Sequence, residues 1–185
     1  MTGEGPTPRR DASRHVVVMG VSGAGKTTVA RGISAATGLS FAEADDFHSA
    51  GNVATMRSGV PLQDADRWPW LRDLAAWMAA CSADGVSTVL ACSALKRSYR
   101  DVLRQGPPGV DFVHLDGAPE VIRERMSRRE GHYMPASLLD SQIAILEPLQ
   151  PDESGLVLDV GLAPAELVRA AVDRLGLSPA PSRRG

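Results

Sequence analysis

Residues 20 to 27 read Gly20-Val21-Ser22-Gly23-Ala24-Gly25-Lys26-Thr27, which matches the spacing G-x-x-x-x-G-K-[ST] of a phosphate-binding loop. Glycines at these positions allow the backbone to curl, so that successive N–H groups point at phosphate oxygens. Lys26 can place a positive charge on the β- and γ-phosphates, and the Thr27 hydroxyl can ligate Mg²⁺. The predicted nucleotide-binding residues are therefore Gly20, Val21, Ser22, Gly23, Ala24, Gly25, Lys26, Thr27 and Thr28.

The residues on either side of this loop fit the strand–loop–helix arrangement that it requires. Residues 15–19 form a short apolar, β-branched run, which predicts a buried parallel strand. The spacing after the loop predicts a helix over 28–37, ended by Gly38. A chance glycine-rich turn is the alternative, but the full eight-residue pattern lies between the two elements where this geometry needs it.

The rest of the chain alternates apolar, strand-like runs with helical patterns. This alternation predicts an α/β fold of the P-loop NTPase class, a five-stranded parallel sheet with helices on both faces. We expect a single domain over 15–177, with flexible tails at 1–14 and 178–185 that are rich in Gly, Pro, Ser and charge. The predicted strands are 15–19, 39–42, 86–91, 110–115 and 156–160.

Two segments are too long and too polar to be simple crossovers, and segments of this length are usually functional. Both should emerge at the carboxyl edge of the sheet, where ligands bind in open α/β folds. Residues 45–68 are predicted to form a substrate-binding arm. Residues 125–151 are predicted to form a lid over the nucleotide, with a helix of its own near 135–147.

Composition limits the classes of partner. The chain has 185 residues and a formal net charge of −2 at pH 7, so no global positive field favours nucleic acid. Its positive charge is concentrated locally, which suits an anionic small molecule. Cys81 and Cys92 form neither a metal-binding spacing nor a disulfide framework and are interpreted as reduced thiols. No run is apolar enough to span a membrane, and we expect a cytoplasmic protein.

Acidic residues follow the second predicted strand, in Glu43-Ala44-Asp45-Asp46-Phe47-His48. A carboxylate beside a phosphate loop can accept a proton from an attacking hydroxyl or hold Mg²⁺, directly or through water. We assign the role of base to Asp45, whereas for Asp46 capping of the next helix is an equal alternative. His48 can donate a hydrogen bond to substrate, although a lone histidine is more often structural.

Further basic residues and one serine are candidates for ligand contacts. Arg57 and Arg67 could bind a carboxylate through the guanidinium fork, or could equally be surface residues or salt-bridge partners. Ser93 and Lys96 follow the third strand. Ser93 is a candidate for the Mg²⁺ shell, through water, and Lys96 could reach a substrate carboxylate or the transferred phosphoryl group.

Arginines are crowded at the start of the predicted lid. Arg125 and Arg129 are four residues apart and share a helix face, where like charges repel unless an anion offsets them. A γ-phosphoryl group in transfer is such an anion. Local salt bridges with Glu124 and Glu130 are the alternative.

Aromatic residues near the arm are better explained by packing than by ligand stacking. Pro69 is predicted to lie in the first turn of a helix. Trp70 and Trp77 then fall at helical spacing with other apolar residues, so we expect both to pack in the core.

Several blocks together resemble the small bacterial and eukaryotic gluconokinases. The most specific blocks are Asp45-Asp46-Phe47-His48, Cys92-Ser93-Ala94-Leu95-Lys96 and Arg129-Glu130-Gly131-His132. The resemblance covers nearly the whole chain except the tails. Many members of the family have Asp where this chain has Glu43, so the metal geometry could differ slightly.

The resemblance implies a nucleoside-monophosphate-kinase-like fold and Mg²⁺-dependent transfer of the ATP γ-phosphoryl group to the 6-hydroxyl of D-gluconate, giving 6-phospho-D-gluconate. It also implies a homodimer. By position it makes Asp45 the base near the acceptor hydroxyl and assigns no role to His132. The implied gluconate contacts are His48, Arg57, Arg67 and Lys96, and the implied lid arginines are Arg125 and Arg129.

Three other functions remain to be weighed. A kinase of the same fold could act on another acid or polyol such as shikimate, and only the resemblance argues against it. A nucleotide-dependent switch is disfavoured because the chain lacks an Asn-Lys-x-Asp block and has an arm rich in Arg and Asp. A nucleic-acid kinase is disfavoured by the net charge.

Overall fold

The computed structural model describes residues 12–127 and 136–180, and its centre is a parallel sheet of five strands. The order β2-β3-β1-β4-β5 and the parallel pairing of all neighbours confirm the predicted P-loop architecture. Strand bounds differ from the predicted ones by no more than two residues. The strands are β1 (His15–Met19), β2 (Ser40–Glu43), β3 (Thr88–Ala91), β4 (Val110–Asp116) and β5 (Gly155–Asp159).

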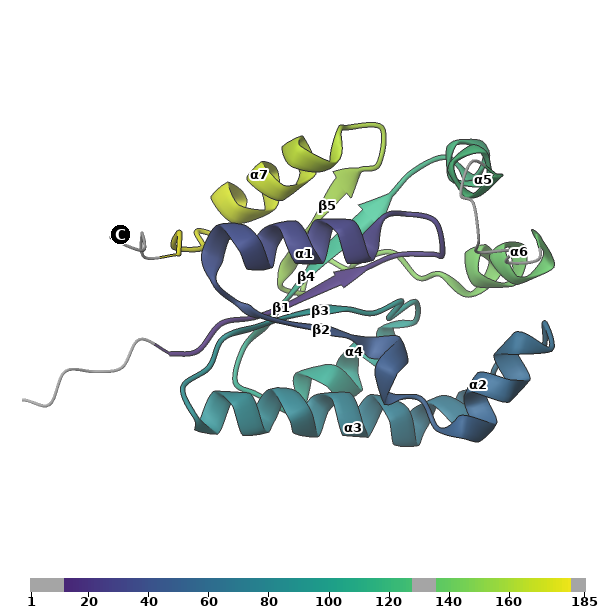
Figure 1. Ribbon diagram of the computed structural model, residues 1–185, viewed down its shortest axis with the longest axis horizontal. Coiled ribbons are helices and arrows are strands. Elements are labelled where there is room, and N and C mark those ends of the chain that lie inside the picture. The colour runs from purple at the N-terminus through teal and green to yellow at the C-terminus, as the bar shows by residue number, and fades with distance from the viewer. Residues whose placement is uncertain (1–11, 128–135, 181–185) are drawn as a thin grey trace, which may run out of the picture.

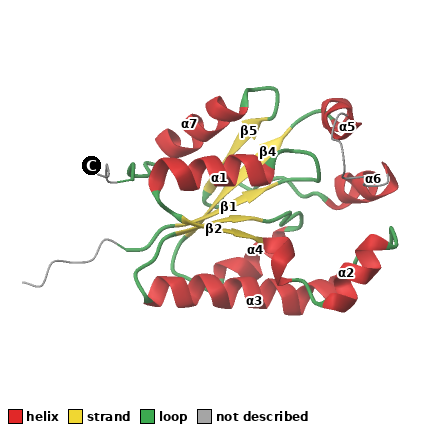
Figure 2. Cartoon of the chain, in the orientation of Figure 1, coloured by secondary structure: helices red, strands yellow, loops and turns green. Residues whose placement is uncertain are grey.

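Helices cover both faces of this sheet (Figures 1 and 2). One face is covered by α1 (Lys26–Thr37) and α7 (Pro164–Arg174), and the other by α3 (Asp64–Ala83) and α4 (Arg97–Arg104). The remaining elements lie toward the carboxyl ends of the strands (Figure 1). They are the 3₁₀ helix η1 (Ala44–Phe47), α2 (Ala50–Arg57), α5 (Pro119–Ser127) and α6 (Ala136–Ile145).

The core is divided by the sheet into two apolar layers. Every residue of β1 is buried, and alternate side chains face opposite layers, with Val16 and Val18 toward α1 and Val17 and Met19 toward α3. Full burial of each such side chain contributes about 1.5–3 kcal/mol. The central strand is thereby fixed, and with it the position of the phosphate loop at its carboxyl end.

The phosphate loop is held close to its neighbours by glycine. A Cβ on Gly20 would lie 2.7 Å from the backbone oxygen of Leu115, and Gly23 has a φ of +84° beneath Met126 of α5. Neither position accepts a side chain without movement of the backbone or of its neighbour. At the other end of α1, Gly38 adopts a left-handed conformation and donates to the Ser34 carbonyl, which confirms the predicted helix stop.

The segment 45–68 is more helical than its polar sequence indicates. It contains most of η1, all of α2 and the start of α3. The prediction that Pro69 lies in the first helical turn is wrong, because α3 begins at Asp64, with a reciprocal contact between Gln63 and Asp66. Pro69 is therefore inside the helix and offers no N–H to the carbonyl four residues earlier.

The tryptophans of α3 pack as expected. Trp70 is buried, and Trp77 packs at the edge of the same apolar layer, which confirms the core assignment for both. His48 stacks on the Trp70 ring, so this part of the core also forms one wall of the site described below.

The two ends of the described chain contact the domain. Arg14, which the sequence places in a tail, forms an ion pair with Asp111 at 2.9 Å and donates to the Leu175 carbonyl. Ala180 donates to the Ala36 carbonyl at 3.0 Å. Residues 1–11 and 181–185 of the predicted tails lie outside the described residues.

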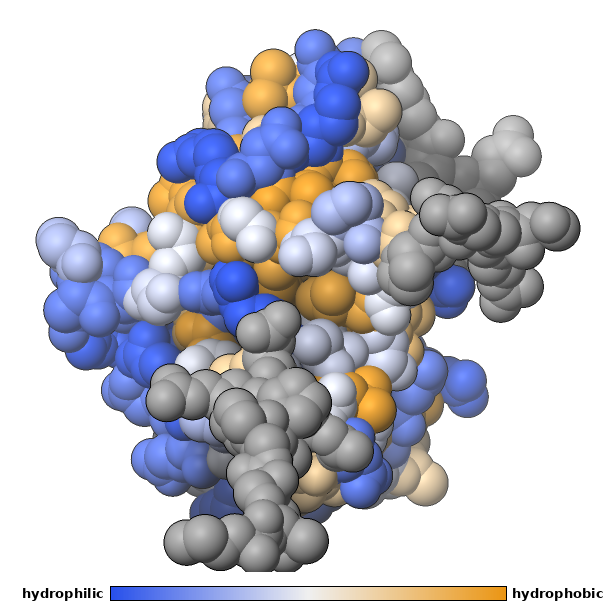
Figure 3. Space-filling view, turned by 90° about the vertical axis from the view of Figure 1, so that its left-hand side faces the viewer, coloured by the Kyte–Doolittle hydropathy of each residue, from blue (hydrophilic) through white to orange (hydrophobic). Residues whose placement is uncertain are grey.

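The end of the molecule opposite α2, α5 and α6 presents a mixture of hydrophilic and hydrophobic residues (Figure 3). Val86, just before β3, is among the exposed large apolar side chains. Within the described ranges no helix is long and apolar enough to cross a membrane.

Candidate active site

A cavity of about 320 Å³ lies where the phosphate loop, the end of β2, the arm, the loop after β3 and helix α6 meet. It brings together seven of the residues predicted from sequence, although they come from four different parts of the chain. These residues are Ser22, Lys26, Asp45, His48, Arg67, Ser93 and Lys96.

Two residues of the phosphate loop make side-chain contacts, one within the loop and one with the end of β2. Lys26 Nζ donates to the carbonyl of Val21 at 3.1 Å, and Thr27 Oγ1 donates to Glu43 Oε2 at 2.7 Å. Burial raises the pKa of Glu43, as does the nearby charge of Asp45, while the Thr27 hydrogen bond and Lys26 oppose the rise. Glu43, the acid at the end of β2, thus contacts the candidate metal-ligating hydroxyl.

These oxygen atoms suit Mg²⁺. The Thr27 hydroxyl and the Glu43 carboxylate are hard ligands that lie within 2.7 Å of each other. No group of three or more His, Cys, Asp or Glu side chains within 12–127 and 136–180 could hold a metal ion. Mg²⁺ is usually bound by one or two protein groups together with water and substrate phosphates.

His48 is held as a stacked ring with a buried side chain. Its imidazole lies 4.3 Å from the Trp70 ring at an interplanar angle of 14°, and the Trp70 indole donates to the Ala44 carbonyl. Burial lowers the pKa of His48, and Arg67 lowers it further, against the opposing charge of Asp45. Its Nε2 is 3.8 Å from Asp45 Oδ1, and its buried Nδ1 has no hydrogen-bond partner among the described residues.

Lys96 is paired with an acid that the sequence analysis missed. Its Nζ lies 2.9 Å from both carboxylate oxygens of Asp64, and the Tyr99 hydroxyl donates to the same carboxylate at 2.5 Å. These hydrogen bonds, that from Tyr99 foremost, lower the pKa of Asp64. Asp64 lies 32 residues from Lys96 in the chain, and nothing in its local sequence marks it.

The two arginines of the arm have different positions. Arg67 lines the cavity, donates through Nε to the Leu62 carbonyl at 3.3 Å, and places its guanidinium 5.7 Å from the centre of the Tyr99 ring. It forms no ion pair with any described residue. Arg57 is exposed at the end of α2 and does not line the cavity.

The loop after β3 is fixed from several directions. The Ser93 carbonyl accepts from the phosphate-loop N–H of Gly20 at 3.3 Å, and Ala94 has a φ of +43°, which is rare for a residue with a side chain. Arg100 Nη1 donates to the carbonyls of Ala94 and Leu95, both at 3.2 Å. The side chains of Ser93 and Lys96 are therefore presented by a loop with little freedom to move.

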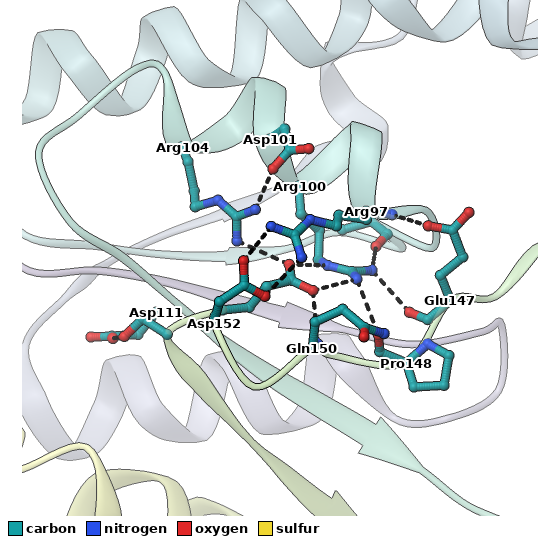
Figure 4. Close-up of polar contacts among 12 residues, drawn as sticks. Arg97, Arg100, Asp101, Arg104, Asp111, Glu147, Pro148, Gln150 and Asp152 are labelled. Carbon is teal, nitrogen blue, oxygen red and sulfur yellow. Dashed lines mark hydrogen bonds and ion pairs between the residues drawn. The ribbon is translucent and has the colours of Figure 1, made fainter.

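The same arginine connects this loop to the segment after α6 (Figure 4). Arg100 also donates to the carbonyls of Glu147 and Pro148, and the Glu147 N–H donates to the Leu95 carbonyl at 2.9 Å. The Arg97 guanidinium pairs with Asp152 through both nitrogens, at 2.8 and 2.6 Å. Sequence analysis missed this network, because its two halves lie about fifty residues apart.

Helix α6 closes the cavity from the opposite side. Leu138, Ser141 and Ile145 line it, and Gln142 Oε1 accepts a hydrogen bond from the Ser22 N–H at 2.6 Å. The prediction of a helix near 135–147 is confirmed by α6.

A second cavity, of about 250 Å³, lies on the other side of the phosphate loop. Arg125 lines it and donates to the Val160 carbonyl. Arg125 therefore lies beside the loop rather than in the first cavity. Arg129 and His132 are outside the described residues. The remaining lining residues are Gly23, Ala24, Gly25, Thr28, Val29, Pro164 and Leu167.

Comparison with known proteins places this site in a family. Residues 16–149 match the family model AAA_33, described as an AAA domain. A gluconokinase of Gluconobacter oxydans is 51% identical over 140 residues, which are 76% of this chain and 79% of the relative.

Solved structures agree. A sugar kinase from Janibacter sp. HTCC2649 is 65% identical, with a TM-score of 0.87 over 90% of this chain and 96% of that one. A gluconokinase from Sinorhizobium meliloti is 44% identical, with a TM-score of 0.80 over 89% and 93% of the two chains. Together with the phosphate loop and the cavity beside it, these similarities show that the chain belongs to the gluconokinase family of P-loop small-molecule kinases.

Proposed function

We propose that the chain transfers the γ-phosphoryl group of ATP to the 6-hydroxyl of D-gluconate, giving 6-phospho-D-gluconate and ADP. The observation that carries this proposal is the 320 Å³ cavity, in which phosphate-loop residues, Arg67 of the arm and Lys96 face the same space. Its volume is at the lower end of the range typical of small-molecule sites. Similarity to gluconokinases supports gluconate as the acceptor.

ATP would lie along the phosphate loop, with its base near the second cavity and its terminal phosphate toward the first. Backbone N–H groups and the Lys26 ammonium would bind the phosphates. Thr27 and Glu43 would hold Mg²⁺, with Ser93 reaching it through water. When bound, this ion neutralises phosphate charge and orients the γ-phosphoryl group.

Gluconate would bind with its carboxylate at Arg67. This guanidinium faces the cavity without an ion-pair partner among the described residues, whereas the charge of Lys96 is already matched by Asp64. The fork of an arginine suits a planar carboxylate. The Lys96–Asp64 pair and His48, which line the same cavity, remain for the hydroxyl groups. Arg57 does not line the cavity and is given no contact with gluconate here.

Asp45 would act as the general base. The 6-hydroxyl oxygen attacks the γ-phosphorus, the bond from that phosphorus to the bridging oxygen breaks, and the electron pair leaves with ADP. The hydroxyl proton passes to the Asp45 carboxylate. We assign Arg125 and Arg129 to charge stabilisation during transfer, for which Arg125 would exchange its contact with the Val160 carbonyl for the phosphoryl group. Shielding by helix α6 would exclude water, which otherwise competes with the acceptor.

We further propose a cytoplasmic homodimer, as the family resemblance implies. Light scattering coupled to size-exclusion chromatography measures the mass, and a monomer at micromolar concentration would contradict the dimer.

The decisive experiment measures ADP release from Mg·ATP with D-gluconate, beside parallel reactions with gluconate epimers, shikimate, glucose and no acceptor. We expect release to depend strongly on D-gluconate, and ³¹P NMR to place the phosphate on the 6-oxygen. Equal release in every reaction would indicate an ATPase or a switch. Preference for another acid or polyol would support the assignment as a kinase but would change the identity of its acceptor.

A further inference from the structure

The contact between Gln142 and Ser22 joins helix α6 to the loop that binds nucleotide phosphates. Gln142 Oε1 accepts from the Ser22 N–H at 2.6 Å, across 120 residues of sequence. N–H groups in a loop of this type are directed at phosphate oxygens. The amide oxygen of Gln142 and a nucleotide phosphate therefore compete for the same donor.

The two cavities indicate which phosphate is involved. Ser22 lines the first cavity with Asp45, Arg67 and Lys96, whereas Gly23 and Gly25 line the second. Ser22 is thus at the acceptor end of the loop, where the terminal phosphate must lie to meet the attacking hydroxyl. A nucleotide that ends at its β-phosphate would leave the contact with Gln142 in place.

The position of Gln142 also determines which contacts its side chain can make once it no longer accepts from the Ser22 N–H. It lies on the face of α6 that lines the first cavity, between Leu138 and Ile145, which line it too. Its carboxamide offers two N–H donors and one acceptor, a set that matches the hydroxyl groups of a polyol. Just after this helix, the Glu147 N–H donates to the Leu95 carbonyl, which anchors the C-terminal end of α6. The Gln142 carboxamide can therefore change its partner by rotation of its own side chain, without movement of the helix.

We propose that Gln142 is an acceptor-site residue that the terminal phosphate of ATP releases from Ser22. Binding of ATP, but not of ADP, frees the carboxamide, which then hydrogen-bonds a hydroxyl group of the acceptor. The site thereby binds its acceptor better when the nucleotide still carries a transferable group. This inference rests on the proposed kinase function and adds a residue role to it.

The variant Gln142→Met tests the competition, because it keeps the length of the side chain and removes the amide. One net hydrogen bond corresponds to a change in affinity of roughly two- to tenfold. We expect the Kd of the ATP analogue AMPPNP with Mg²⁺, measured by titration calorimetry, to fall by that factor. The Kd of ADP should not change. The KM for D-gluconate should rise by a similar factor.

A second variant and a control separate this effect from a general loss of structure. Gln142→Glu can still accept from Ser22 but repels phosphate, so it should weaken AMPPNP more than ADP. Ala144→Gln, on the exposed side of α6, should leave both affinities and the KM unchanged. An unchanged AMPPNP affinity in Gln142→Met, equal tightening of ADP, or an unchanged KM for gluconate would overturn the proposal. The nucleotide titrations need no acceptor, so they test the competition between Gln142 and phosphate even if gluconate is not the substrate.

Discussion

Arg100 and Glu153 form a two-point ion pair in which both side chains are fully shielded from solvent, with Nε 2.7 Å from Oε1 and Nη2 2.8 Å from Oε2. Burial alone would raise the pKa of Glu153, but hydrogen bonds from Arg100, the Gln150 N–H and Arg104 outweigh it and lower the pKa to about 2. The pair ties helix α4 to the segment between α6 and β5, and so fixes the base of the predicted lid.

Replacement of Arg100 by Met should be strongly destabilising. It leaves the Glu153 carboxylate buried without its partner, a change that typically costs about 3–5 kcal/mol. Urea unfolding followed by circular dichroism measures the loss. Arg97→Met removes an exposed pair with Asp152 and should cost much less.

The double variant Arg100→Met/Glu153→Leu should recover part of the lost free energy of unfolding, because no unpaired charge is then buried. If Arg100→Met is no less stable than Arg97→Met, the buried pair does not have the role assigned to it.

The proposed base can be tested without disturbing the fold. Asp45 is exposed on the cavity rim, so Asp45→Asn should leave the melting temperature and the Kd of AMPPNP unchanged. Loss of a general base typically lowers turnover by about 100- to 10,000-fold. Steady-state kcat with saturating gluconate measures the effect. A kcat within a few-fold of the unmodified protein would assign the proton transfer elsewhere.

Arg67 should be required for binding the carboxylate of the acceptor. Arg67→Gln removes a charged hydrogen-bond donor and should raise the KM for D-gluconate by roughly 10- to 100-fold. The KM for ATP should change little. Arg72→Gln is the matched control, because Arg72 is on the same helix but exposed and away from the cavity. Equal KM values in the two variants would exclude Arg67 as the carboxylate partner.

His114 should contribute to the pH dependence of stability. It is buried in β4, neither ring nitrogen has a hydrogen-bond partner among the described residues, and burial lowers its pKa from 6.5, with Arg100 adding to the effect and Asp116 opposing it. The unfolded chain therefore binds a proton more readily than the folded one. Stability is full above pH 6.5 and falls as pH decreases through 6.5 toward the lower pKa of the folded state.

The variant His114→Met should reduce the slope of stability against pH below pH 6.5. His15 and His48, whose pKa values burial also lowers, would retain part of it. Melting temperatures between pH 7.5 and 5.5 provide the measurement. We expect equal or higher stability at pH 7.5, since a buried polar ring without partners is removed. A slope as steep as that of the unmodified protein would contradict the assignment.

The phosphate loop and the strands could be predicted because their signals are local. Eight consecutive residues specify the loop between 20 and 27, and each strand is an apolar run bounded by polar residues or glycine. Local turns and burial patterns follow from neighbouring residues alone. For the same reason the sequence predicts Gly38 as a helix stop and Trp70 as a core residue, and both predictions are confirmed.

Only the tertiary structure pairs residues that are distant in the chain. The phosphate-loop motif predicts Lys26, and positions just after predicted strands predict Asp45 and Lys96. The contacts of Lys96 with Asp64 and of Gln142 with Ser22 span 32 and 120 residues. Their formation depends on how helices pack against the sheet, which the spacing of residues in the sequence does not encode. The sequence by itself thus determined the class of chemistry, whereas packing decided which charges are already paired and which remain for a substrate.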